Sequence, residues 1–240
     1  FARRGLIDEA IEELKIAISI NPDFASAHLN LGSANHKKGL IDKAIEEFKI
    51  AIRLNPRDAT AYLSMGNAYY DKGLIAEAIL EFKTAIRLNP RDAVANNNLG
   101  NAYLKKGLLE DAINEYRVAI GKNPDYASAH NNLGAIYFSK DLVDEAIKEY
   151  EIAIKLNPDF ALAHNNLGVA YDAKGLFKEA VKEWKTAIRV YPNYASAHYN
   201  LGAAYHDGGL LDEAIEEYKT AIRLKQDYAK AHYNLGNTYD

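Results

Sequence analysis

Histidines recur through the chain at multiples of one interval, and a metal centre is the first chemistry they suggest. They stand at corresponding points 34 or 102 residues apart, at His28, His130, His164, His198 and His232. Side chains on successive helices lie at least about 8–10 Å apart, whereas zinc needs its ligand nitrogens about 2 Å from one centre. We therefore predict no metal site and interpret these residues as half-buried packing histidines with a satisfied ring nitrogen. A second hypothesis is that their protonation near pH 6 loosens the structure.

Asparagines form a second row two residues further along. The row reads Asn30, Ser64, Asn98, Asn132, Asn166, Asn200 and Asn234. An amide side chain has one acceptor and two donors, which match the N–H and C=O groups of an extended peptide. Each such contact is worth only about 0.5–1.5 kcal/mol, but a row of them adds up. Together with their neighbours, these amides predict a peptide-binding surface; the other candidate residues are Asn97, Asn101, Asn131, Asn165, Tyr199 and Tyr233.

Catalytic patterns are absent from the sequence. It has no glycine-rich phosphate loop, no Gly-x-Ser-x-Gly and no HExxH, so we expect no enzyme activity and no cofactor. Its carboxylates are expected to lie on a solvated helix face. The 29 Lys and Arg against 33 Asp and Glu give a net charge of -4, which provides no basic field for nucleic acid. No apolar run is long enough to span a bilayer, so no membrane partner is expected. A chain without cysteine fits reducing and oxidising compartments alike, and the cytoplasm is only slightly favoured.

A ladder of prolines reveals the elements that carry these side chains. Its members are Pro22, Pro56, Pro90, Pro124, Pro158 and Pro192, 34 residues apart, and Gln226 breaks it. A period of this length indicates stacked copies of one supersecondary unit that cannot bury its apolar face alone. Apolar periodicity predicts a first helix (helix A) over 127–140 and a second (helix B) over 144–156, with glycine or Asp141 ending helix A. Helix B ends before the proline, and an aspartate near it is expected to cap the next helix A.

The period divides the chain into repeats. We predict one array over residues 1–240, with complete repeats at 25–58, 59–92, 93–126, 127–160, 161–194 and 195–228. Residues 1–24 are then a partial repeat, mainly helix B, and residues 229–240 a partial repeat with helix A only. Both ends fall inside a helix, so we expect a segment of a longer array with unfinished stacking faces. The predicted fold class is all-α, an α-solenoid of antiparallel helix pairs.

These residues resemble the tetratricopeptide (TPR) repeat. The resemblance rests on Asn132-Leu133-Gly134, Tyr137, Ala146, Tyr150, Ala153 and Pro158 and on their counterparts throughout the chain. It implies a right-handed superhelix whose inner groove is lined by helix A at repeat positions 2, 5, 6, 9, 12 and 13. The arrays of bacterial TPR proteins and of O-linked N-acetylglucosamine transferases look similar, and the latter use an asparagine ladder for substrate polypeptides. Asparagine is also common at position 6 across the family. The ladder alone therefore does not show whether these residues bind a peptide or are only typical of the repeat.

The resemblance implies a non-catalytic module that binds an extended peptide or partner segment in the groove. No arginine stands at position 6, which argues against the clamp that grips acidic chaperone tails. Two alternatives stay open. One is a scaffold that stacks head to tail, and the other is the targeting domain of a larger enzyme such as a glycosyltransferase.

Overall fold

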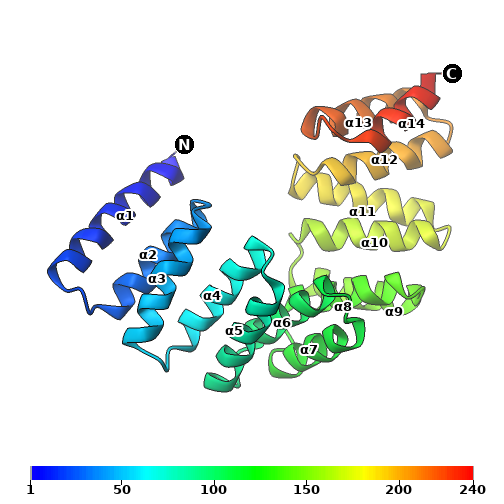
Figure 1. Cartoon of the computed structure of the whole chain (residues 1–240). Coiled ribbons are helices and arrows are strands. Elements are labelled where there is room, and N and C mark those ends of the chain that lie inside the picture. The colour runs from blue at the N-terminus through cyan, green and yellow to red at the C-terminus, as the bar shows by residue number, and fades with distance from the viewer. Residues whose placement is uncertain (1, 240) are drawn as a thin grey trace. The chain divides into compact units, whose positions relative to one another are not determined.

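The computed structural model describes residues 2–239, with side chains described from residue 6 onward, and it is all-α throughout that range. Figure 1 shows a succession of helical hairpins. The helices, in chain order, are α1 (Ala2–Ile20), α2 (Ala25–Lys37), α3 (Ile41–Leu54), α4 (Ala59–Lys72), α5 (Ile75–Leu88), α6 (Ala93–Lys105), α7 (Leu109–Lys122), α8 (Ala127–Ser139), α9 (Val143–Leu156), α10 (Ala161–Ala173), α11 (Phe177–Val190), α12 (Ala195–Asp207), α13 (Leu211–Leu224) and α14 (Ala229–Tyr239). Even-numbered helices are A helices and odd-numbered helices are B helices. Each A helix begins at the first residue of a predicted repeat.

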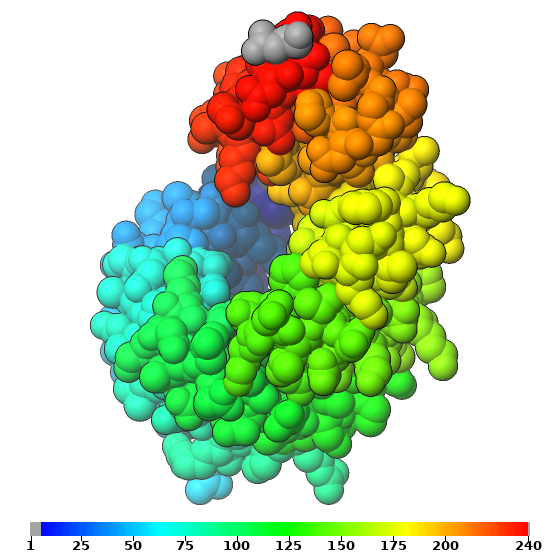
Figure 2. Space-filling view, turned by 90° about the vertical axis from the view of Figure 1, so that its right-hand side faces the viewer, coloured from blue at the N-terminus to red at the C-terminus, as the bar shows by residue number. Residues whose placement is uncertain are grey.

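The chain forms two compact units, Phe1–Pro124 and Asp125–Asp240. The N-terminal unit contains α1 to α7, and the C-terminal unit contains α8 to α14. Figure 2 shows the C-terminal unit as successive layers, coloured from green through yellow and orange to red. Each unit is a stack in which every repeat packs on its neighbour, as expected for a solenoid.

Within each unit the A helices lie on the inner side of the stack. An A helix packs against the B helices before and after it, as α4 does against α3 and α5. Consecutive A helices also approach one another, for example α10 and α12, whereas among the described residues no Cα atoms of consecutive B helices come within 8 Å. The A helices are therefore closer together than the B helices, and each stack curves toward them.

A glycine of helix A and an aromatic ring of helix B form the centre of each complete hairpin. A Cβ atom on Gly168 would lie 2.5 Å from Nε1 of Trp184, and one on Gly134 would lie 2.8 Å from Cε1 of Tyr150. The expected approach of helix A to the helix-B alanine is also present, since the same Cβ on Gly134 would lie 3.2 Å from the carbonyl oxygen of Ala146. The aromatic ring, rather than the alanine, is the nearest neighbour of the glycine.

The helix ends agree in part with those predicted from the sequence. Gly73 follows α4 with φ +85°, and Asp141 takes the same left-handed conformation at φ 62° in the repeat that lacks this glycine. Asp58 caps α4 by accepting from the backbone N–H groups of Thr60 and Ala61.

The prediction that an aspartate near the proline caps the next helix A was wrong for Asp23, Asp125 and Asp159. In the Asp-aromatic copies the N-cap residues are Phe24, Tyr126 and Phe160, which make no side-chain cap hydrogen bond. The carboxylates of Asp23, Asp125 and Asp159 stand one residue too early, because the aromatic residue follows rather than precedes the aspartate.

Candidate peptide-binding face

The inner surface of the A helices carries the predicted asparagines, and in the C-terminal unit these form one chain of hydrogen bonds. Nδ2 of Asn200 donates to Oδ1 of Asn165 at 3.1 Å, and Nδ2 of Asn165 donates to Oδ1 of Asn166 at 3.5 Å. Nδ2 of Asn166 then donates to Oδ1 of Asn131 at 3.0 Å, and Nδ2 of Asn131 donates to Oδ1 of Asn132 at 3.4 Å. We call these five residues the amide relay. It links α12, α10 and α8 and orients every amide in it.

Members of the relay differ in exposure. Asn131 and Asn165, at repeat position 5, are 2% and 6% exposed. Asn132, Asn166 and Asn200, at position 6, are half-buried. The position-5 amides therefore lie beneath the surface and hold the position-6 amides, which solvent reaches.

The N-terminal unit has a shorter version of the same arrangement. Nδ2 of the buried Asn97 donates to Oδ1 of Asn98 at 3.2 Å, and Nδ2 of Asn98 donates to Oδ1 of Asn67 at 2.8 Å. Asn101 accepts a hydrogen bond of 2.6 Å from the hydroxyl of Tyr116. Asn30 is exposed on α2 and, within the described residues, joins no such bond. The structure thus groups Asn97 and Asn98, which are predicted site residues, with Asn67, which is not one.

Tyrosines continue the arrangement at α12 and α14. Tyr199 occupies position 5 in place of asparagine, and Nδ2 of Asn234 lies 3.3 Å from its hydroxyl and 3.4 Å from that of Tyr218. The Tyr199 ring also lies 5.0 Å from the ring of Tyr228, measured between centroids. Tyr233 is 70% exposed and stands apart from this group.

Hollows open on this face at the same repeat positions in both units. Both include positions 9, 12, 13 and 24 of one repeat and positions 6 and 9 of the next, and the hollow of the N-terminal unit also includes position 12 of the preceding repeat. The hollow in the N-terminal unit, about 290 Å³, is lined by His36, Asn67, Tyr70, Asp71, Phe82, Asn98 and Asn101. The hollow in the C-terminal unit, about 200 Å³, is lined by Ala203, His206, Asp207, Tyr218, Asn234 and Asn237.

Charge on this face differs between the units. In the N-terminal unit, Nε2 of His36 lies 2.9 Å from Oδ2 of Asp71, and Nζ of Lys105 lies 4.7 Å from the centroid of the Tyr70 ring. In the C-terminal unit, burial and then the negative charge of Asp207 raise the pKa of Asp172. The residues at positions 12 and 13 therefore make the charge of the inner surface differ from one repeat to another, although the backbone scaffold is the same.

Of the five recurring histidines, predicted to be half-buried, His28, His130, His164 and His198 are buried and His232 is exposed. Each has a hydrogen-bonded ring nitrogen, as expected, but the partners were not predicted from the sequence. Nδ1 of His164 lies 2.6 Å from Oε2 of Glu183 and its Nε2 lies 3.0 Å from the carbonyl oxygen of Pro158. His198 pairs with Glu217 and Pro192 in the same way. These helix-B glutamates, 19 residues beyond each histidine, are therefore not part of a merely solvated face. The fixed spacing of 19 in the sequence was the signal that could have revealed them.

Both partners of His164 and both partners of His198 are hydrogen-bond acceptors, so both ring nitrogens of each can donate only when the imidazole is protonated. Burial alone lowers the pKa of His164, but the hydrogen bonds to Glu183 and to the carbonyl of Pro158 outweigh it, and the net pKa is raised. The same causes raise the pKa of His198. Protonation therefore favours the folded hairpin at these two residues, which is the opposite of the loosening hypothesis.

No group of three or more His, Asp or Glu side chains able to hold a metal ion occurs among the described residues. Across residues 2–239, no helix has the length and apolarity required to cross a membrane.

A stack of antiparallel helix pairs with a 34-residue period defines the class of helical-repeat solenoids. The family model for the TPR repeat matches seven successive segments, at residues 1–39, 36–73, 66–107, 100–141, 136–175, 173–209 and 204–239. The chain therefore belongs to the TPR repeat family, as the sequence predicted. No curated protein matches it.

Solved structures with the same fold include three of different extent. A chain in the APC/C hetero-tetramer Cut9–Hcn1 superposes with a TM-score of 0.87 at 19% identity, over 98% of this chain and 46% of that one, so this chain spans about half its length. MamA superposes with a TM-score of 0.58 at 33% identity, over 71% of this chain and 93% of MamA. YrrB, described as a TPR protein with an unusual peptide-binding site, superposes with a TM-score of 0.57 at 24% identity, over 78% of this chain and 96% of YrrB.

Proposed function

We propose that this protein is a non-catalytic interaction module that binds an extended peptide segment of a partner protein along the inner surface of its A helices. The TPR fold supports a protein–protein interaction module. The observation that carries the finer proposal is the amide relay of the C-terminal unit, which fixes the half-buried amides of Asn166 and Asn200.

An anchored amide is well suited to this task. Asn166 uses one of its two N–H groups on Asn131 and accepts one hydrogen bond from Asn165, and an amide oxygen has two lone pairs. One N–H and one lone pair of Asn166 therefore remain for a peptide backbone. Because the side chain is already held in place, binding costs less rotamer entropy than it would for a free surface asparagine.

The direction of the face adds selectivity. A bound segment would meet Asn166 and Asn200 on α10 and α12 and then the tyrosines around Tyr199. Buried aromatic residues often dominate the binding energy of an interface. We therefore expect the partner segment to place an apolar or aromatic side chain beside Tyr199. YrrB, which shares the fold, offers a precedent for peptide binding within this architecture, although its identity to this chain is too low to transfer a site.

The test uses a phage library of random 12-residue peptides selected against the immobilised full chain. Selected peptides are then measured by calorimetry on the wild type and on the double variant Asn166→Ala and Asn200→Ala. We expect a loss of affinity of about 5- to 150-fold, since two hydrogen bonds of about 0.5–1.5 kcal/mol each are removed. The matched control is Asn114→Ala on the exposed surface of α7, which should leave affinity unchanged.

The outcomes are distinct. Equal binding by the double variant, with an unchanged melting temperature, would show that the relay does not contact the peptide. Selected peptides that bind equally to the Asn114→Ala control and lose affinity on the double variant would support the proposal. Sedimentation of the wild type over a concentration series tests the scaffold alternative, since a monomer at every concentration argues against head-to-tail stacking.

A further inference from the structure

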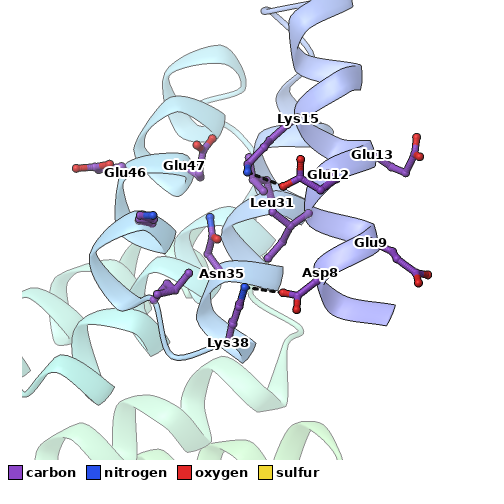
Figure 3. A pocket seen from close by; sticks show the side chains of 13 residues that line it. Asp8, Glu9, Glu12, Glu13, Lys15, Leu31, Asn35, Lys38, Glu46 and Glu47 are labelled. Carbon is purple, nitrogen blue, oxygen red and sulfur yellow. Dashed lines mark hydrogen bonds and ion pairs between the residues drawn. The ribbon is translucent and has the colours of Figure 1, made fainter. Parts of the chain in front are cut away.

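A hollow of about 730 Å³ opens on the other side of the N-terminal unit, between α1, α2 and α3. Its volume is within the range of roughly 300–1,000 Å³ that is usual for ligand pockets. Ile11 and Leu31 are among the residues that line it, together with Asn35 and Leu40, and charged side chains surround them (Figure 3). The hollow is separate from the peptide-binding face proposed above, because it is bounded by the B helices α1 and α3.

A single residue explains why the hollow occurs here. Repeat position 11 is tyrosine in each of the six later repeats, at Tyr69, Tyr103, Tyr137, Tyr171, Tyr205 and Tyr239. In the first complete repeat this position is Asn35. The shorter side chain leaves open the space that a tyrosine ring takes elsewhere between one helix A and the two B helices around it.

Two of the later repeats show how a tyrosine in this space meets a lysine of the preceding helix B. Nζ of Lys83 lies 5.7 Å from the centroid of the Tyr103 ring, and Nζ of Lys185 lies 5.5 Å from that of Tyr205. Both lysines stand at position 25 of the preceding repeat, in its helix B. At these distances a cation is attracted to the face of an aromatic ring. Lys15 on α1 holds the same position beside the hollow. The first complete repeat therefore has the lysine beside this space but lacks the tyrosine ring.

Asn35 itself is an unusual lining residue. It is 6% exposed, yet its side-chain amide makes no hydrogen bond within the described part of the chain. Figure 3 shows this side chain extending from α2 into the space between α1 and α3. No side-chain nitrogen or oxygen of the described residues is both fully buried and unpaired, so the polar atoms of this amide open into the hollow. A ligand that enters the hollow can therefore hydrogen-bond to them.

The charges around the hollow indicate what flanks the ring. Six carboxylates and three lysines line it. Three of the carboxylates are already paired: Glu12 with Lys15 at 2.8 Å, Asp8 with Lys38 at 2.5 Å, and Glu47 with Nδ1 of His28 at 2.7 Å. The excess of carboxylates favours a positively charged partner.

We propose that this hollow receives an aromatic side chain of a partner protein, flanked by basic residues. The ring occupies the place of the position-11 tyrosine beside Lys15. The Asn35 amide hydrogen-bonds to the phenol or backbone of the partner, and the surrounding carboxylates bind the flanking cations. Two surfaces of one array then engage partners through different chemistry, an extended backbone on the A helices and an aromatic anchor on the B helices.

The test titrates the full chain with the blocked tripeptide Lys-Tyr-Lys and follows the backbone amide signals of Leu31 and Leu40 by NMR. We expect a saturable shift that is absent with Lys-Ala-Lys and in the variant Asn35→Tyr, which places the ring inside the chain as the other repeats do. Replacing the flanking lysines, as in Glu-Tyr-Glu, should weaken binding at least about fivefold at low salt. The matched control is Asn114→Tyr on the exposed surface of α7, which should bind as the wild type does.

Three results would overturn the proposal. They are no saturable shift in the wild type at millimolar peptide, equal binding by Asn35→Tyr with its fold intact, and equal binding of the alanine and tyrosine peptides. Equal or tighter binding of Glu-Tyr-Glu would overturn the assignment of a basic partner. Because none of these measurements involves Asn166 or Asn200, failure here leaves the peptide-binding proposal for the A helices unaffected.

Discussion

Replacing Gly168 by alanine tests the close packing on which each hairpin depends. The added Cβ would lie 2.5 Å from Nε1 of Trp184, 2.8 Å from its Cδ1 and 2.9 Å from its Cε2. Carbon contacts are normally about 3.5–4.0 Å, so the indole must retreat by roughly 1 Å. The ring is 2% exposed and its N–H donates to the carbonyl oxygen of Asn165 at 3.2 Å. It therefore cannot move without disturbing both packing and a hydrogen bond.

The cost can be estimated from these contacts. Overpacking typically costs about 1–3 kcal/mol, and the loss of one hydrogen bond adds about 1 kcal/mol. Replacing glycine by alanine within a helix returns about 0.5–1 kcal/mol. We expect a net destabilisation of about 1–3 kcal/mol, and a fall in melting temperature of roughly 2–12 °C for a chain of this length.

The assay is direct because the sequence has one tryptophan, Trp184. Its fluorescence reports on the perturbed ring during thermal or urea unfolding. The matched control is Gly236→Ala, at the same repeat position in α14, where an added Cβ meets nothing within 4 Å. That variant should be as stable as the wild type or slightly more so. If Gly168→Ala keeps the wild-type melting temperature and emission maximum, close approach is not the reason for the glycine.

Two further predictions concern protonation and capping. Since the folded pKa values of His164 and His198 are raised, their stabilisation is complete below the ordinary value near pH 6.5 and is lost as the pH rises through the raised values. The melting temperature should therefore decrease as the pH is raised from 5.5 to 8, and it should decrease less in Glu183→Gln. A melting temperature that increases over this interval would contradict the assigned hydrogen bonds. Asp92→Ala should lower the free energy of urea unfolding by about 1 kcal/mol, because Asp92 caps α6. Asp159→Ala should cost little because Asp159 caps no helix, and equal losses for the two variants would refute the distinction.

The sequence predicted the helical hairpins well because their determinants are local and repeated. Proline ends helix B, glycine ends helix A, and seven copies reduce the ambiguity that a single copy would carry. The exception is capping, where the expectation treated Asp58 and Asp159 as equivalent. A shift of one residue decides whether a carboxylate reaches the first N–H groups of the helix, and the mixed order of Arg, Asp and aromatic residues around the proline hid that shift.

The site was only partly predictable, because an amide's partners come from other repeats. The row at position 6 was visible in the sequence, but the donation from Asn166 to Asn131 spans 35 residues and two helices. The period shows which residues are equivalent without showing which of them touch. The burial of Asn165 beneath Asn166 likewise depends on the angle at which α10 meets its neighbours. The proposed contact of these amides with a peptide stays a prediction.

A departure from the repeat changes the binding surface more than the repeated residues do. At position 5, replacement of asparagine by Tyr199 keeps a polar group within reach of Asn234, so the hydrogen-bonded row continues with a different surface. At position 11, Asn35 replaces tyrosine without changing the helical scaffold. The smaller side chain leaves a hollow beside Lys15. In a stack whose neighbours supply the core, one substitution changes the surface locally without requiring the rest of the array to adjust. A repeat array can therefore acquire a recognition site when one copy has a small side chain at a position where the other copies have a large one.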